Sequence, residues 1–296
     1  MHSGLDTQVL KDVSRSFYLS LRFLPKNFRP AASLGYLLAR ASDTFADAPI
    51  WSVEERKELL QEFRQHVLKG GNFTAPENTE GLPDGERVLL DHLDDCMRAL
   101  AGLSEAEQKS IRKVVGIITE GQTWDLVRFD GSGVTGLKDD AELRHYTYQV
   151  AGCVGEFWTE IGFATDDDFA TRSQGEMNEL GQAYGRSLQL INILRDVPED
   201  LANGRIYLPN AMSREELMSA RGPWIEEALA GLASAGKYAA ALNGKRMRFG
   251  TILPALIGRE TLLRLQESSW EEWEKKVKVT RAEVRGMMWQ GVKFAL

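Results

Sequence analysis

Two pairs of aspartates in this 296-residue sequence have a spacing suited to metal binding: Asp43 with Asp47, and Asp196 with Asp200. An α-helix turns about 100° per residue, so residues four positions apart share one face. Like charges at that spacing repel each other, and in an apolar setting the repulsion is costly unless cations neutralise the pair. Hard divalent cations such as Mg²⁺ bind carboxylate oxygens together with substrate phosphate oxygens. We therefore expect these four aspartates to hold Mg²⁺.

Other polar side chains share the face of each pair. Tyr36 and Arg40 lie with the first two aspartates on a stripe about 60° wide. Gln189 and Asn192 lie with the second two on a stripe about 80° wide. Aspartates at this spacing are also common on solvent-exposed helices, but these two helices lack the Lys- and Glu-rich outer face of an exposed helix. Both stripes are therefore candidates for a functional site.

Two such helices facing each other across a bundle interior would place a Mg²⁺-bound diphosphate at the mouth of an apolar cavity. Ionisation of an allylic diphosphate needs charge stabilisation on the leaving group. The resulting carbocation needs a pocket that excludes water. The two stripes therefore predict an enzyme that acts on a substrate with a diphosphate head and an apolar chain.

The elements that position these residues are predicted to be helices nearly throughout. Apolar residues recur at i, i+3 and i+4, while the alternation typical of strands is almost absent. Ser52 with Glu55 and Ser104 with Glu107 have the pattern of capping boxes. We expect a single all-α domain over residues 1–296, a bundle of about ten or more helices around a central hydrophobic cavity. The predicted helices cover about residues 6–22, 30–47, 53–69, 84–101, 104–128, 139–163, 172–201, 223–243, 251–267 and 281–293.

Composition excludes several other classes of protein. The net charge is −7 with no dense Lys/Arg block, so nucleic acid is not an expected partner. The chain shows no signal peptide and no run of about 18 apolar residues, so we expect no transmembrane segment. Two separated cysteines, Cys96 and Cys153, predict buried thiols in a reducing compartment. We therefore expect a cytoplasmic protein.

Residues 131–136, Gly-Ser-Gly-Val-Thr-Gly, match the glycine spacing of a dinucleotide-binding loop. That motif works only between a strand and a helix of a βαβ unit. The preceding segment is predicted to be helical, so a connecting loop is the favoured interpretation.

The C-terminal segment 273–296 carries six basic residues against two acidic ones, with Met287, Met288, Trp289 and Phe294 nearby. Docking of a terminal helix on the core is one interpretation. Peripheral contact with an anionic membrane is the other. The sequence gives no oligomeric state.

Four motifs together resemble the squalene/phytoene synthase family, all-α enzymes that join two prenyl diphosphates head to head. They occur in the family's order and spacing, and the resemblance covers nearly the whole chain. The last of them, with its Gly-Arg-x-Tyr-x-Pro ending, is the most specific. The four are SRSF at 14–17, YLLARASDTFAD at 36–47, YTYQVAGCVGEFW at 146–158 and LQLINILRDVPEDLANGRIYLP at 188–209.

The resemblance implies a role for residues in each motif. The four aspartates would hold Mg²⁺ ions that bridge the substrate diphosphates. Tyr146 matches the tyrosine credited with moving a proton as the cyclopropane intermediate forms, and Tyr36 and Arg40 would assist. Arginine suits diphosphate because its planar fork matches phosphate oxygens. The residues that would bind or position substrate are Ser14, Arg15, Ser16, Phe17, Gln189, Asn192, Arg195 and Arg205.

Three positions depart from the family's pattern. Ala46 stands where many squalene synthases have an acid, and Val13 stands where phytoene and dehydrosqualene synthases often have His. Pro198 lies inside the second aspartate motif, where it removes a backbone donor. We expect this proline to bend or tighten the turn that leads to Asp200.

Two groups of residues in the motifs have two interpretations each. Gly152 and Gly155 each cost a helix about 1 kcal/mol relative to alanine. They would keep a helix wall thin beside a hydrocarbon, or they would allow close packing of two helices. The aromatic side chains Phe45, Phe157 and Trp158 would line a substrate pocket or pack in the core.

The form LLARASDT at 37–44 resembles squalene synthases more than phytoene synthases. The resemblance therefore implies condensation of two farnesyl diphosphates to presqualene diphosphate, followed by reduction with NADPH to squalene. A phytoene, dehydrosqualene or presqualene diphosphate synthase that stops without reduction is the alternative. A non-catalytic scaffold would have lost aspartates, and all four are present. A terpene cyclase or chain-elongating prenyltransferase should lack the first and third motifs.

Overall fold

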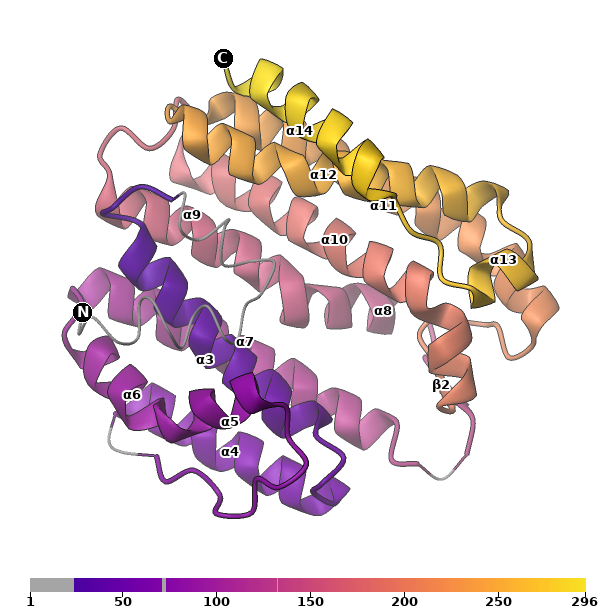
Figure 1. Ribbon diagram of the computed structural model, residues 1–296, viewed down its shortest axis with the longest axis horizontal. Coiled ribbons are helices and arrows are strands. Elements are labelled where there is room, and N and C mark those ends of the chain that lie inside the picture. The colour runs from indigo at the N-terminus through magenta and orange to yellow at the C-terminus, as the bar shows by residue number, and fades with distance from the viewer. Residues whose placement is uncertain (1–23, 71–72, 132) are drawn as a thin grey trace. The chain divides into compact units, whose positions relative to one another are not determined.

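The structure, a computed structural model, describes residues 24–70, 73–131 and 133–296. Helices make up nearly all of its regular structure (Figure 1), which confirms the all-α prediction. The named strands are β1 (Thr135–Gly136) and β2 (Arg205–Ile206), which pair in parallel. The predicted helix over residues 6–22 lies outside the described residues. The described chain groups into two compact units, one up to residue 127 with 160–167 and one with 128–159 and 168–296.

The first unit has an aromatic core beneath α3. The ring of Phe45 lies 5.5 Å from those of Phe63 and Phe73 and 6.0 Å from that of Trp51, measured between centroids. Phe45 has no exposed surface, so it packs in the core and does not line a pocket. The helices of this unit are α3 (Arg29–Asp47), α4 (Val53–Lys69), α5 (Asp84–Asp91), α6 (Leu93–Ala101) and α7 (Glu105–Arg128).

Both predicted capping boxes form, at Ser52 with Glu55 and at Ser104 with Glu107. The helix predicted over residues 84–101 is divided into α5 and α6 at His92. The ring Nδ1 of His92 lies 2.8 Å from the carbonyl oxygen of Val88.

The second unit is organised around its longest helix, α10, which contacts α8, η2, α11, α12 and α13. A capping box at Ser173 and Glu176 begins α10, and the helix runs through Pro198 without ending there. The elements of this unit are α8 (Asp140–Thr147), the π-helix η2 (Tyr148–Gly152), most of α9 (Cys153–Thr165), α10 (Gln174–Ala202), α11 (Arg214–Ala241), α12 (Lys245–Glu267), α13 (Trp270–Glu274) and α14 (Arg281–Ala295).

Two predicted helix starts are wrong. Helix α11 begins with a capping box at Ser213 and Glu216, so Pro223 lies inside the helix and not at its start. Helix α12 begins at Lys245, and Pro254 lies inside it. In α11 the capping box, upstream of the proline, decides where the helix begins. Helix α13 was not predicted.

Close helix packing explains the glycines of the third motif. A Cβ added at Gly155 would lie 1.9 Å from the carbonyl oxygen of Gly181, and one added at Gly185 would lie 2.2 Å from that of Ala151. Real side chains cannot approach a backbone so closely. These glycines therefore let η2 and the start of α9 lie directly against the backbone of α10.

None of the helices in the described part of the chain is both long enough and apolar enough to cross a bilayer. Cys96 and Cys153 are free and buried. Burial raises the pKa of the Cys96 thiol to about 12, so this cysteine is unreactive as a nucleophile at neutral pH.

Candidate active site

The first aspartate stripe is the accessible strip of a helix that is otherwise buried. Twelve of the nineteen residues of α3 are buried, whereas Tyr36, Arg40 and Asp43 are partly accessible and Asp47 is exposed. Helical periodicity therefore places the polar residues together, as predicted. However, the strip is open on one side, so its acids are not enclosed within this unit.

Asp43 is held by two neighbours from different elements. The amide Nε2 of Gln122 on α7 donates a hydrogen bond to Asp43 Oδ1 at 2.8 Å. The guanidinium of Arg40 lies 3.8 Å from Asp43 Oδ2 and makes a shorter ion pair, 2.6 Å, with Glu86 on α5. Glu86 therefore orients Arg40 beside the aspartates.

The pKa of Asp43 is raised to about 7, first by desolvation within the surrounding protein and second by repulsion from Asp47, against the lowering effects of Arg40 and Gln122. The side chain keeps 45% of its surface accessible, so solvent still screens part of this penalty. Burial also raises the pKa of the Tyr36 phenol, and the Asp43 charge adds to that rise.

The donor set of this strip suits a divalent cation of the magnesium type. Among residues 24–70, 73–131 and 133–296, no group of three or more His, Cys, Asp or Glu side chains forms a preformed metal cage. Mg²⁺ does not require one, because it is commonly held by one or two carboxylates together with substrate phosphates and water. The oxygen ligands of Asp43 and Asp47 fit this requirement.

The second stripe lies on α10, whose opposite faces are buried. Gln189, Asp196 and Asp200 are partly accessible, and Asn192 is exposed. Arg195 binds the neighbouring Asp196 through two hydrogen bonds, from Nε at 2.9 Å and from Nη2 at 2.6 Å.

This contact gives the stripe a built-in positive charge. The hydrogen bonds to Asp196 raise the pKa of Arg195 further. Nearby, the Lys276 ammonium donates to Glu199 at 2.5 Å. Two cations of the chain therefore offset part of the negative charge of the second stripe.

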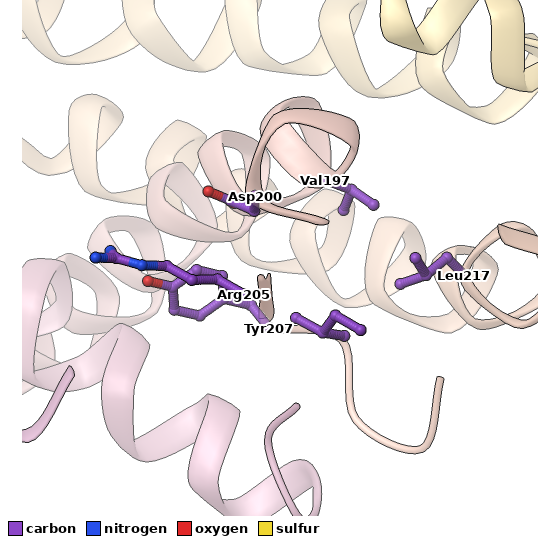
Figure 2. Close-up of a pocket in the computed structure, with 6 residues that line it drawn as sticks. Val197, Asp200, Arg205, Tyr207 and Leu217 are labelled. Atoms are coloured by element: carbon purple, nitrogen blue, oxygen red, sulfur yellow. The ribbon is translucent and has the colours of Figure 1, made fainter. Parts of the chain in front are cut away.

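Asp200 lines a shallow pocket with Arg205 and Tyr207. Figure 2 shows these three residues on one side of the pocket, with Val197 and Leu217 on the other. The pocket encloses no space for even a water molecule, so it cannot hold a prenyl chain. Its geometry instead brings a carboxylate and a guanidinium together at the end of α10.

Backbone geometry at the end of α10 explains the Gly-Arg-x-Tyr part of the fourth motif. Gly204 has φ of +77°, a conformation that favours glycine. The turn at Gly204 lets Arg205 pair with Thr135 in the β1–β2 ladder. Strand β2 is followed directly by Tyr207, which is buried.

Tyr146, the predicted catalytic tyrosine, lies in an aromatic stack. Its ring is 5.2 Å from that of Tyr207 with an interplanar angle of 20°. Tyr207 in turn lies 5.0 Å from Phe129, whose face is covered by the guanidinium of Arg205 at 5.9 Å. The π-helix η2 begins two residues after Tyr146, and such irregular turns are frequent at functional sites.

The remaining predicted site residues, Ser14, Arg15, Ser16 and Phe17, lie outside the described residues. Asp43 and Asp47 belong to the first unit, whereas Asp196 and Asp200 belong to the second. The shared cavity therefore stays a prediction.

Three residues of the described site had no role assigned from the sequence: Gln122, Glu86 and Tyr207. Tyr207 stands within the fourth motif, which was a usable signal. Gln122 and Glu86 lie 79 and 46 positions from their partners, and nothing local marks them.

The model of the squalene/phytoene synthase family matches residues 10–283. The chain belongs to this family. Homologues in the squalene/phytoene synthase family are prenyltransferases. The match includes all four motifs.

Individual relatives include proteins with different products. The chain is 28% identical over 203 residues to a probable squalene synthase of Neurospora crassa, covering 69% of this chain and 41% of that protein. It is 31% identical over 210 residues to a phytoene synthase of Mycobacterium tuberculosis, covering 71% and 56%. The chain thus spans about half the length of these curated relatives.

A solved structure of TcSQS with the ligand E5700 has the same fold. The two agree with a TM-score of 0.79 at 22% identity, over 99% of this chain and 89% of that chain. At this identity the likeness supports the family's fold and does not select a product.

The glycine-rich stretch at 131–136 is not a dinucleotide-binding loop of the βαβ kind. It follows helix α7, and Gly131 and Gly133 both have positive φ within a connection. The described residues between α7 and β1 therefore form the predicted connection.

Proposed function

We propose that this chain catalyses the Mg²⁺-dependent head-to-head condensation of two farnesyl diphosphates to presqualene diphosphate, and its reduction with NADPH to squalene. The observation that carries the proposal is the pair of accessible carboxylate strips on α3 and α10, in a chain of the squalene/phytoene synthase family. The form LLARASDT at 37–44 favours squalene over phytoene as the product.

Each strip would contribute to one part of the chemistry. Asp43 and Asp47 on α3, and Asp196 and Asp200 on α10, would hold Mg²⁺, which supplies positive charge for the departing diphosphate when bound. Arg40, Arg195 and Arg205 would contact phosphate oxygens, with Ser14, Arg15, Ser16 and Phe17 from the first motif and with Gln189 and Asn192.

Tyr146 would move the proton that the substrate loses as the cyclopropane ring forms, through its phenolic oxygen and assisted by Tyr36. The stack on Tyr207 limits rotation of the Tyr146 ring, so the oxygen would stay in one position through the reaction. A proton-transfer group needs such a fixed position, because it must lie within hydrogen-bond distance of the atom with which it exchanges the proton.

The deciding experiment incubates the purified full chain with farnesyl diphosphate and Mg²⁺, with and without NADPH, and identifies products by mass spectrometry. Squalene formed only with NADPH supports the whole proposal. Presqualene diphosphate, hydroxysqualene or dehydrosqualene in both arms supports condensation and overturns the reductive step. A forty-carbon product made only from geranylgeranyl diphosphate overturns the squalene assignment. The Asp43→Asn and Asp196→Asn variants should form no product.

We further propose a cytoplasmic enzyme whose C-terminal helix contacts an anionic membrane surface. Each interpretation of this segment is supported by a different face of α14. Met287, Gly291 and Ala295 are buried, and α14 contacts α12. The other face exposes 71% of Trp289 and 40% of Val292. Arg281 and Arg285 are exposed beside these apolar side chains, a combination typical of interfacial helices.

A further inference from the structure

Gln122 is a buried amide with one half of its hydrogen-bonding capacity unused. Its side chain belongs to α7 and only 8% of the residue's surface is exposed. Nε2 donates to Asp43 Oδ1 at 2.8 Å. The other amide atom, Oε1, is buried and has no hydrogen-bond partner within the part of the chain that the structure describes.

An unsatisfied acceptor at this depth calls for an explanation, because buried polar atoms in proteins almost always have partners. The amide cannot resolve it by turning over. Turning would place Oε1 against Asp43 Oδ1, so two acceptors would face each other whenever Asp43 is ionised. A methionine or leucine would fill a similar volume without this cost. A glutamine at this position is therefore explained best if a bound ligand donates the missing hydrogen bond to Oε1.

We propose that Gln122 is a positioning residue of the Asp43 metal site, and that Oε1 accepts a hydrogen bond from a water molecule bound to the cation. This inference rests on the proposed function. Mg²⁺ gives up its hydration shell reluctantly and keeps several waters when bound to protein. A metal-bound water is a donor, which is what Oε1 lacks.

The same amide also orients the carboxylate. Because Oδ1 of Asp43 is engaged by Gln122, rotation of the carboxylate is restricted and Oδ2 is the oxygen left toward Arg40 and the accessible side of the strip. Partners of this kind, one step removed from a metal, typically change metal affinity by about 10- to 100-fold when they are removed.

The test compares Gln122→Met with a matched control, Gln65→Met, which changes an exposed glutamine on α4 of the same unit. Mg²⁺ affinity is measured on the full chain with inorganic pyrophosphate present, by the metal dependence of the melting temperature. Mn²⁺ electron paramagnetic resonance provides a second readout. We expect Gln122→Met to weaken cation binding by about 10- to 100-fold and Gln65→Met to leave it unchanged. Excess Mg²⁺ should restore the reaction rate of Gln122→Met, which a merely structural defect would not allow.

Gln122→Asn covers the case in which Gln122→Met fails to fold. It keeps an amide but is one methylene shorter, so the contact with Asp43 Oδ1 and the position of Oε1 are both lost. We expect it to weaken cation binding as Gln122→Met does.

The outcomes separate the two proposals. Wild-type affinity in Gln122→Met, or in Gln122→Asn where the methionine variant does not fold, overturns the role of Gln122 while leaving the proposed function intact. A wild-type chain that shows neither cation binding nor product formation overturns both.

Discussion

Replacing Asp43 by asparagine should stabilise the metal-free protein above pH 7. The asparagine side chain keeps an oxygen that can accept the hydrogen bond from Gln122 Nε2, but it removes the charge that faces Asp47. The pKa of Asp43 is raised from 3.8 to about 7 in the folded chain. The folded state therefore binds the proton more tightly than the unfolded state, and ionisation of Asp43 destabilises the fold.

The size of the effect follows from the shift. About three pKa units correspond to an upper limit of about 4 kcal/mol. The Asp43 side chain is 45% accessible, so solvent screening reduces this to about 1–2 kcal/mol. For a chain of this length 1 kcal/mol changes the melting temperature by about 2 °C. We expect the variant to melt about 2–4 °C above the wild type at pH 8.

The sign of the pH dependence is fixed by the direction of the shift. Wild-type stability should fall as pH rises from about 4 to about 7 and then level off, because the proton is lost over that window. The Asp43→Asn variant has no such titration, so the difference in melting temperature should be absent near pH 4 and complete above pH 7.

Thermal unfolding followed by circular dichroism in EDTA, at pH 4 to 8, measures this difference. Asp91→Asn, at an exposed position on α5, serves as the control and should show no gain. A difference that does not change with pH, or an Asp43→Asn variant that melts below the wild type at pH 8, would refute the electrostatic reasoning. The Asp43→Asn variant should also be inactive. Under the proposed function the negative charge of Asp43 binds Mg²⁺, and asparagine lacks that charge.

Three further outcomes are expected. Gly185→Ala should lower the melting temperature by several degrees, because its Cβ would lie 2.2 Å from a backbone oxygen. The control Gly175→Ala, whose Cβ would have nothing within 4 Å, should not. Equal melting temperatures for the two variants would contradict the close packing of α10. Tyr207→Leu should lower the maximal rate in steady-state assays about 10-fold or more, because it releases the Tyr146 ring. Tyr207→Phe keeps the stacked ring and should be near wild type. A Tyr207→Phe variant as slow as Tyr207→Leu would show that the Tyr207 hydroxyl matters instead. Arg285→Glu should reduce flotation with anionic but not neutral liposomes, and a wild-type chain that never floats would remove the membrane proposal.

The aspartate stripes were predictable because helical periodicity is local. On α3 the residues predicted to share a stripe, Tyr36, Arg40, Asp43 and Asp47, are all accessible, whereas twelve of the helix's nineteen residues are buried. Their partners were not predictable. Gln122 reaches Asp43 from α7, 79 positions along the chain, and nothing in the spacing of α7 marks that contact.

Helix ends show the same division between local and distant causes. The starts of α4 and α7 were predicted because each capping box is a contact over three residues. The predicted start of α11 at residue 223 missed the capping box at Ser213 and Glu216. The glycines of the third motif were recognised, but only the path of α10 shows that Gly155 meets Gly181.

The structure also changes the physical reason why the chain tolerates its aspartates without metal. The sequence argument required cations to neutralise both pairs. On α10, Arg195 binds Asp196 through two hydrogen bonds, so the chain supplies its own cation. On α3, the raised pKa of Asp43 lets a proton neutralise the carboxylate near pH 7.

Under the proposed function, metal binding would displace a proton from the first strip and a guanidinium from the second, and both displacements would weaken the affinity of the free chain for Mg²⁺. A bound diphosphate would offset the cost of releasing Arg195 from Asp196, because the freed guanidinium could then bind phosphate oxygens in a bidentate geometry. Under the proposed function, the second strip would bind its metal well only when substrate arrives with it.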